Sequence, residues 1–424
     1  MKTILSIDGG GVRGIIPGII LQKLEEQLQD IAQINNKLNP ILEKETWNDY
    51  DEVNIEKLED RLHDILSRDK KARLVDYFDV VAGTSTGGLI AIMLVAGRKS
   101  AANIATADSQ PIFQAKDIKE FYMKHCPEIF PRYRFGILQT LKMIFFGPKY
   151  DGKYLRELLQ NRFGDTMIKD TKPNLVLTTF DINLMQPTIF TTYDAKLSDN
   201  KNALLSDICL GTSAAPTYLP PWSFFSADKS RMYHLIDGGV AENNPTLVAL
   251  NSLSKEEDGK SKEVDMDDVL ILSLGTGSAT RSNVPYDTDS VSGWGCLEWM
   301  YQSKGNRHPI LDCFAESSAD MVDIYASTIF RFDSRNKNYL RVQYDDLKVE
   351  ESSMDNSTPE NLKRLVQIGR KVVGSPMVAF DLSNSQRQAV SLARDISHAK
   401  GWKILDSFAR KLYNARISVV VVRC

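Results

Sequence analysis

The stretch Gly83-Thr84-Ser85-Thr86-Gly87 decides how this chain is interpreted, because it stands between two apolar runs. The run at 77–82 before it is typical of a buried strand, and the run at 88–96 after it is typical of a helix. In such a strand–turn–helix unit, a serine between two glycines occupies a tight turn that exposes its hydroxyl group. The pattern predicts Ser85 as a nucleophile. The alternative is a small-residue loop that caps a helix.

A glycine-rich turn lies near the N-terminus. Residues 2–7 are predicted to form a short buried strand, and residues 8–14 (DGGGVRG) lead from it into an amphipathic helix near 14–32. The run from Gly9 to Gly14 matches G-x-G-x-x-G, which makes a nucleotide-binding oxidoreductase an alternative. That fold requires an acidic residue at the end of a second strand about 20 residues later, where this sequence stays helical and then becomes polar. The other use of such a loop is to present backbone N–H groups to an oxyanion.

The third motif is Asp237-Gly238-Gly239, which ends a strand predicted at 231–236. A carboxylate followed by two glycines at a strand end is able to approach another backbone turn closely. Asp-Gly is also a common turn pair, so this motif alone does not establish a catalytic role.

These three motifs, in this order, resemble the patatin-like phospholipases, and in particular the plant-type patatins. The segments that carry the resemblance are 8–14, 76–80, 83–88, 146–155, 214–218, 237–241 and 272–277. The similarity extends through 338–343 to about residue 375, and more loosely to Arg416. Two insertions relative to the plant proteins lie near 36–70 and 100–110.

The resemblance implies a serine–aspartate dyad, with Ser85 as nucleophile and Asp237 as general base. It also implies an oxyanion hole made by the backbone N–H groups of Gly9, Gly10 and Gly11, in a loop supported by Arg13 and Gly14. An aspartate with an ordinary pKa is a weak base. We therefore expect burial to raise the pKa of Asp237.

The α/β-hydrolase fold uses the same serine turn but requires a histidine late in the chain. The histidines here are His63, His125, His234, His308 and His398. None stands in a context that indicates catalysis, and we expect His234 to pack beside the site.

The alternation of strands and helices predicts a three-layer α/β/α fold with a mostly parallel central sheet. Strands are predicted near 2–7, 78–82, 174–182, 188–193, 231–236 and 268–274, and helices near 14–32, 87–97, 115–125 and 205–212. We expect residues 1–250 to form the catalytic core and residues 251–424 to complete the same fold with a mainly helical C-terminal lobe. That lobe would include short strands near 329–333 and 339–344. The Val-rich end at 417–424 is predicted to be a terminal strand or a disordered tail.

Composition supports a globular enzyme. The 424 residues are 42% hydrophobic and carry a net charge of −3, so there is no electrostatic case for nucleic acid. The five widely spaced cysteines show no metal or disulfide pattern. We expect a cytoplasmic protein, because neither a signal peptide nor a spanning apolar run is visible.

Aromatic, aliphatic and basic residues mix at 130–146 and 218–225, as expected of an acyl channel or a lipid-facing surface, although ordinary core is the alternative. The resemblance implies hydrolysis of phospholipid or galactolipid acyl esters, without cofactor or metal. The expected partner is a membrane lipid or lipid-like ester, reached through peripheral membrane contact. The alternative is a storage or binding protein of the same fold with little turnover.

Overall fold

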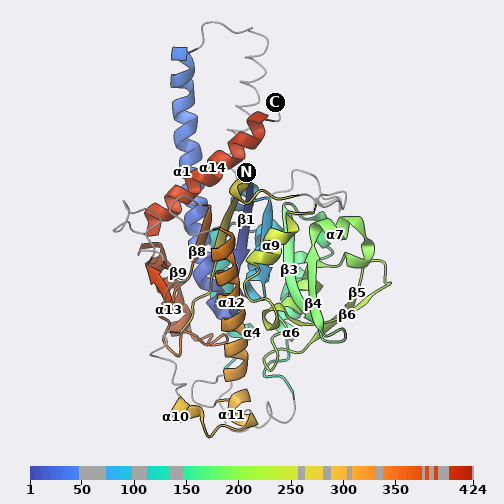
Figure 1. The fold of residues 1–424 in the computed structure, drawn as a ribbon. Helices are drawn as coiled ribbons and strands as arrows, with labels where there is room; N and C mark the ends of the chain where they lie inside the picture. The colour runs from blue at the N-terminus through green and yellow to red at the C-terminus, as the bar shows by residue number, and fades with distance from the viewer. Residues whose placement is uncertain are drawn as a thin grey trace.

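The computed structural model describes most of the chain, and Figure 1 shows its arrangement. The described residues are 1–46, 73–97, 112–132, 147–255, 263–279, 288–302, 308–330, 338–374, 378–381, 386–389 and 401–422. The expectations for residues 133–146, for His63 and His398, and for most of the two insertions fall outside these ranges.

A mixed, mostly parallel sheet forms the centre of the molecule. Its strands are β1 (Lys2–Ile7), β2 (Val80–Thr84), β3 (Asn174–Asp181), β4 (Gln186–Thr191), β5 (Trp222–Phe225), β6 (Met232–Asp237), β7 (Val269–Leu274) and β8 (Tyr339–Val342). The strand order is β5-β6-β3-β2-β1-β7-β8, with β4 paired to β3. Strands β3, β2, β1, β7 and β8 are parallel, whereas β4, β5 and β6 add antiparallel pairs at one end. A separate two-stranded sheet pairs β9 (Val378–Asp381) with β10 (Gln386–Ala389).

Helices connect and cover these strands. They are α1 (Ile15–Thr46), α3 (Thr86–Val95), α4 (Ala115–Ile129), α6 (Lys153–Phe163), α7 (Thr192–Leu197), α8 (Leu205–Thr212), α9 (Thr246–Ser252), α10 (Thr288–Val291), α11 (Cys296–Met300), α12 (Pro309–Ile329), α13 (Pro359–Gly374) and α14 (Gly401–Val422). Within the described residues, none of these helices is both long and apolar enough to cross a membrane.

Two hydrophobic clusters lie on opposite faces of the sheet. Successive strand residues point to opposite faces, so Leu5 belongs to the larger cluster with α1, α3 and α4, while Ile4 belongs to the smaller one. The smaller cluster includes residues of α9 and α12, which lie in front of the parallel strands in Figure 1. This arrangement confirms the predicted three-layer fold with a helical C-terminal region.

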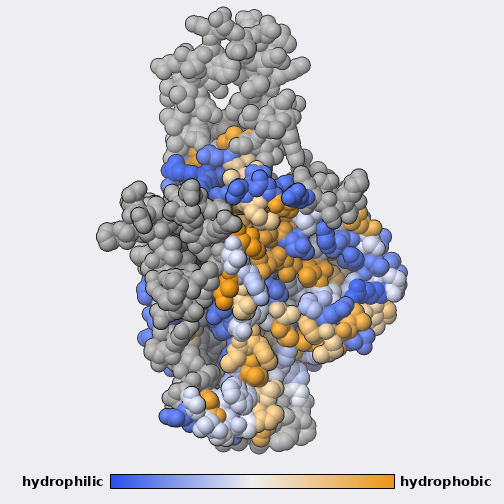
Figure 2. Space-filling model, viewed as in Figure 1, coloured by the Kyte–Doolittle hydropathy of each residue, from blue (hydrophilic) through white to orange (hydrophobic). Residues whose placement is uncertain are grey.

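The antiparallel end of the sheet carries apolar residues at its surface. Ile189 of β4 and the paired residues Phe225 and Met232 are exposed. In Figure 2, apolar and hydrophilic side chains are mixed over this end of the molecule, and the apolar ones lie mainly toward the middle. The smaller cluster, by contrast, lies over the parallel strands, where it includes Ile4, Val80 and Ile271.

Some elements differ from the prediction. Helix α1 continues to Thr46, well past the predicted end at residue 32. The prediction of a strand or disordered tail at the C-terminus was wrong, because α14 runs to Val422 and buries Leu405 and Leu412 in the main core. The predicted strand at 329–333 is not found in its described part, since Ile329 is the last residue of α12. Helices α6 and α9 and strand β5 were not predicted.

Candidate active site

Ser85 lies in a tight turn between β2 and α3. Its φ of 54° falls in a region that non-glycine residues rarely adopt, which marks stored backbone strain. A Cβ at Gly83 would lie 2.2 Å from the Gly87 carbonyl oxygen, and one at Gly87 would lie 2.1 Å from the Ile7 carbonyl oxygen. Both glycines are needed because backbone segments touch here, which brings the serine turn against the end of β1.

Thr212, the last residue of α8, holds the strained turn in place. The Ser85 N–H donates to Thr212 Oγ1 at 2.8 Å, and the Thr212 hydroxyl donates to the Thr178 carbonyl at 2.7 Å. The backbone of Ser85 is thereby fixed to β3 through one buried side chain. The sequence reasoning did not single out Thr212, because nothing in its local pattern marks it.

The sheet register brings Asp237 to Ser85. Strand β2 pairs with β3 as far as Thr84 opposite Thr178, and β6 pairs with the next residue of β3, Thr179, through Asp237. Because Thr178 and Thr179 are neighbours, this register brings the C-terminal ends of β2 and β6 together on the two sides of β3, although β6 runs antiparallel to β2. The Ser85 hydroxyl then donates to Asp237 Oδ2 at 2.6 Å.

Asp237 is buried, and its environment suits a base. Burial raises the pKa of its carboxyl from 3.8 to about 6, although the hydrogen bonds from Ser85 and from the Gly239 N–H lower it. The Gly239 N–H donates to Oδ1 at 2.8 Å, so the two carboxylate oxygens have different partners. A pKa near 6 leaves the group ionised at neutral pH yet more basic than an ordinary aspartate.

The glycine loop lies against Ser85, but only part of it has amides available for an oxyanion. The Gly9 N–H donates to the Asn243 carbonyl oxygen at 3.1 Å, so this N–H already has a partner within the protein. Among the described residues, the N–H groups of Gly10 and Gly11 have no hydrogen-bond partner. Gly11 also lines the cavity that contains Ser85.

The loop packs too tightly to accept side chains. A Cβ at Gly9 would lie 2.4 Å from Asn243 Oδ1, one at Gly10 would lie 2.2 Å from Thr276 Oγ1, and one at Gly14 would lie 2.5 Å from the Tyr122 hydroxyl oxygen. The chain itself therefore fills the space around these glycines. In addition, β2, the strand next to β1, ends in the serine turn and not in an acidic residue, which disfavours the dinucleotide alternative.

Two buried arginines anchor this loop. Arg13 donates to the carbonyl oxygens of Gly10 at 3.2 Å and Gly277 at 2.7 Å. Arg341 of β8 binds Asp8 through two hydrogen bonds, of 2.9 and 2.6 Å, and its Nε lies 3.2 Å from Asp323. The sequence reasoning missed Arg341, although a charged residue within the apolar strand 339–342 is a signal for a buried ion pair.

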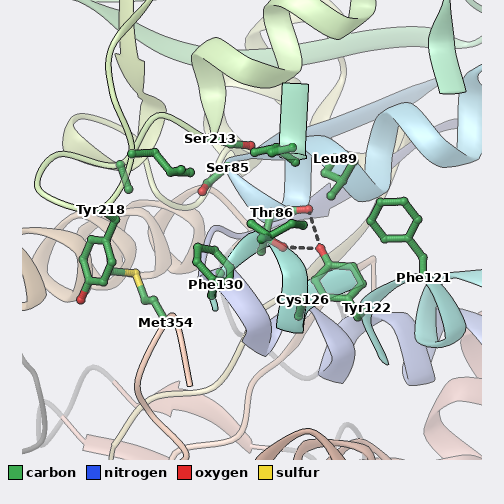
Figure 3. A pocket seen from close by; sticks show the side chains of 15 residues that line it. Ser85, Thr86, Leu89, Phe121, Tyr122, Cys126, Phe130, Ser213, Tyr218 and Met354 are labelled. Atoms are coloured by element: carbon green, nitrogen blue, oxygen red, sulfur yellow. Dashed lines mark hydrogen bonds between the residues drawn. The ribbon is translucent and has the colours of Figure 1, made fainter. Parts of the chain in front are cut away.

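An apolar cavity of about 70 Å³ opens beside Ser85. In Figure 3, the rings of Phe130, Tyr122 and Phe121 lie across the cavity from Ser85, while Tyr218 and Met354 lie at another side. The Tyr122 hydroxyl donates to the Thr86 carbonyl at 3.2 Å, which ties α4 to the residue after the serine. Of the two aromatic segments proposed to form a channel, Phe130 and Tyr218 reach this cavity.

The three described histidines have other partners. His125 bonds the Tyr154 hydroxyl at 2.7 Å, and His308 bonds the Met300 carbonyl at 2.8 Å. His234 bonds Ser223 at 3.1 Å and, by strand alternation, lies on the opposite face of β6 from Asp237, so it does not pack beside the dyad as predicted. In the described part of the chain, no group of three or more His, Cys, Asp or Glu side chains is arranged to hold a metal ion.

Comparisons with known proteins identify relatives of this chain. A family model described as patatin-like phospholipase matches residues 54–250. Patatin-like protein 2 of Arabidopsis thaliana is 40% identical over 91% of this chain and 86% of its own length, and patatin-like protein 1 of Oryza sativa subsp. indica is 38% identical over 98% and 90%. Patatin-04/09 of Solanum tuberosum is 36% identical over 89% and 85%. Among solved structures, VipD from Legionella pneumophila has a TM-score of only 0.30 at 11% identity, and the match covers 87% of this chain and 67% of that chain. With such identity over nearly its whole length, the chain belongs to the patatin-like family.

Proposed function

We propose that this protein is a lipid acyl hydrolase in which Ser85 is the nucleophile and Asp237 the general base. The observation that carries the proposal is the 2.6 Å hydrogen bond from the Ser85 hydroxyl to Asp237 Oδ2, at the wall of an apolar cavity. A serine hydroxyl is a poor nucleophile unless a base lies within hydrogen-bond reach. The raised pKa of Asp237 supplies that base near neutral pH.

In the first half of the reaction, Ser85 Oγ attacks the ester carbonyl carbon while Asp237 Oδ2 accepts its proton. The carbonyl oxygen becomes an oxyanion, and its stabilisation is assigned to the N–H groups of Gly10 and Gly11. Removing one such donor typically costs about 3 kcal/mol of transition-state stabilisation. Collapse of the intermediate breaks the ester C–O bond, Asp237 returns the proton to the leaving alcohol, and the acyl group remains on Ser85.

In the second half, a water molecule attacks the acyl carbonyl carbon of the acyl-enzyme, while Asp237 accepts a proton from that water. The intermediate then expels Ser85 Oγ, which takes the proton back, and a fatty acid leaves. The apolar lining of the cavity suits the hydrocarbon chain of an acyl group. These features support an acyl ester as substrate.

The test is covalent labelling combined with turnover. An organophosphonate ester should modify Ser85, as located by peptide mass spectrometry, and wild-type protein should hydrolyse a p-nitrophenyl acyl ester. Ser85→Ala should lose both reactions while unfolding normally, whereas the exposed control Ser230→Ala should keep both. Folded wild-type protein that showed neither labelling nor turnover would support a storage or binding role and refute the proposal.

A further inference from the structure

A second, smaller cavity lies beside the one that contains Ser85. It holds about 20 Å³ and is lined by residues that include Arg156 and Trp222. Leu155 and Leu219 line both cavities, so the two share a wall. Ala214 also lines the smaller cavity, and its carbonyl accepts the Asp237 backbone N–H at 3.0 Å. The smaller cavity is therefore next to the catalytic dyad.

Arg156 stands in this cavity without a charged partner. Its guanidinium carbon lies 4.4 Å from the centre of the Trp222 ring, and its Nε is buried without a hydrogen bond. The Trp222 indole N–H donates to Asp207 at 3.0 Å, which fixes the ring that the guanidinium lies over. Within the described part of the chain, no carboxylate forms an ion pair with Arg156.

Other basic side chains around the site are already engaged. Arg13 binds two carbonyl oxygens, Arg341 binds Asp8, and Lys149 forms an ion pair with Asp355. Arg156 differs from them because its charge has no counterpart among the described residues. A half-buried arginine without a counter-ion, held rigidly at a cavity, points to an anionic ligand.

The geometry favours a phosphate group. A guanidinium carries its N–H donors in its own plane, where they are able to bind a phosphate through two parallel hydrogen bonds. The exposed Asp151 also lines the cavity, but it pairs with Lys153 at 3.8 Å, which offsets its charge. In a glycerophospholipid, the phosphate and the acyl ester are attached to the same glycerol, so a phosphate site beside the dyad fits one substrate molecule.

We propose that Arg156, supported by Trp222, binds the phosphodiester of a glycerophospholipid whose acyl ester reaches Ser85. This inference rests on the proposed acyl hydrolase function and names its substrate class. It assigns the phosphate to Arg156 at the smaller cavity, whose volume of about 20 Å³ does not hold a whole head group, and the acyl chain to the larger cavity. A galactolipid, which has no phosphate, gains nothing from Arg156.

The experiment compares three substrates in Arg156→Gln. These are a phosphatidylcholine and a monogalactosyl diacylglycerol with the same acyl chains, both in neutral-detergent micelles, and a p-nitrophenyl acyl ester. We expect kcat/KM for the phospholipid to fall about tenfold or more, the effect typical of losing a hydrogen bond to a charged group. The other two substrates should change less than twofold. Arg156→Lys, which keeps the charge but loses the paired donors, should be intermediate.

The matched control is Arg162→Gln, which removes the same charge from the exposed side of the same helix and should leave all three substrates unchanged. Equal losses on all three substrates in Arg156→Gln would show a structural role and overturn the proposal. An unchanged phospholipid rate would overturn it as well.

A binding measurement separates this inference from the proposed function. In a Ser85→Ala background, which hydrolyses nothing, monomeric dihexanoyl phosphatidylcholine should alter the Trp222 fluorescence, and Arg156→Gln should weaken that binding about tenfold. Trp222→Phe identifies the signal. Failure of turnover with this binding intact would refute the hydrolase only, whereas normal turnover with unchanged binding in Arg156→Gln would refute the phosphate site only.

Discussion

Replacing Asp237 by asparagine tests the proposed chemistry and the energetic cost of the site together. Asparagine has nearly the same shape, and its side-chain oxygen is still able to accept one hydrogen bond. The asparagine side chain is unable to accept a proton, so the substitution removes the base while the packing around residue 237 stays the same. Loss of a positioned general base typically lowers the rate by about 10²- to 10⁴-fold.

The pH dependence of the wild-type rate follows from the pKa of Asp237. With a pKa of about 6, the carboxylate is about 90% ionised at pH 7 and about 10% ionised at pH 5. The wild-type kcat/KM should therefore fall about tenfold between these pH values, because only the ionised form accepts the serine proton. The residual rate of Asp237→Asn should be flat over the same range.

The same raised pKa predicts that this group's contribution to stability falls as the pH rises, whereas the rate increases. Burial raises the pKa of Asp237 from 3.8 to about 6, so the folded protein holds this proton more tightly than the unfolded chain. The favourable contribution is fully present below pH 3.8 and is lost as the pH rises through 6. At about 1.4 kcal/mol per pKa unit, the ionised carboxylate costs up to about 3 kcal/mol at pH 7.

Asp237→Asn should therefore be more stable than wild type at pH 7, by up to this amount, and no more stable near pH 4. Denaturant unfolding of both proteins at the two pH values measures their free energies of unfolding. Subtracting the wild-type value from the variant value at each pH cancels the contribution of the other titrating groups. An asparagine variant that kept the acid limb of the rate profile would refute Asp237 as the base. Equal stability gains at both pH values would refute the role assigned to burial.

Thr212→Val, which removes the hydroxyl that accepts the hydrogen bond from the Ser85 N–H, should lower kcat about tenfold with little change in KM. It should also lower the free energy of unfolding in denaturant by about 1–3 kcal/mol. Thr212→Ser should recover kcat, and a normal kcat in the valine variant would contradict the positioning role. Gly10→Val should slow phosphonate labelling of Ser85, measured by mass spectrometry, far more than it weakens lipid binding, measured by vesicle co-sedimentation. The reason is that its Cβ would lie 2.2 Å from a neighbouring hydroxyl oxygen and would distort the donors that act on the transition state. Equal effects on labelling and binding would count against an oxyanion role. Arg341→Met should lower the free energy of unfolding by about 3–5 kcal/mol, because it leaves Asp8 buried without its cation; a stability within 1 kcal/mol of wild type would show that the pair does not hold the loop.

The sequence determined the local units. A strand, a glycine-flanked serine and a helix in that order permit only a tight turn, so Ser85 was predictable, and the glycine loop and Asp237 were visible for the same reason. Periodicity also predicted the three-layer fold, since buried parallel strands and amphipathic helices have distinct patterns. Periodicity predicted short or atypical elements, such as β5 and α6, less well. It also failed at the C-terminus, where tertiary packing overrides the strand preference of β-branched residues and holds them in helix α14.

Only the tertiary structure decided how the motifs meet. Thr84 and Asp237 lie opposite Thr178 and Thr179, two consecutive residues of β3, and no local pattern specifies that register. The use of the Gly9 amide by Asn243, the support of Ser85 by Thr212 and the ion pair of Asp8 with Arg341 all join residues more than 100 positions apart. Local sequence encodes backbone conformation and periodicity, whereas hydrogen-bond partners and burial depend on which segments the completed fold brings into contact.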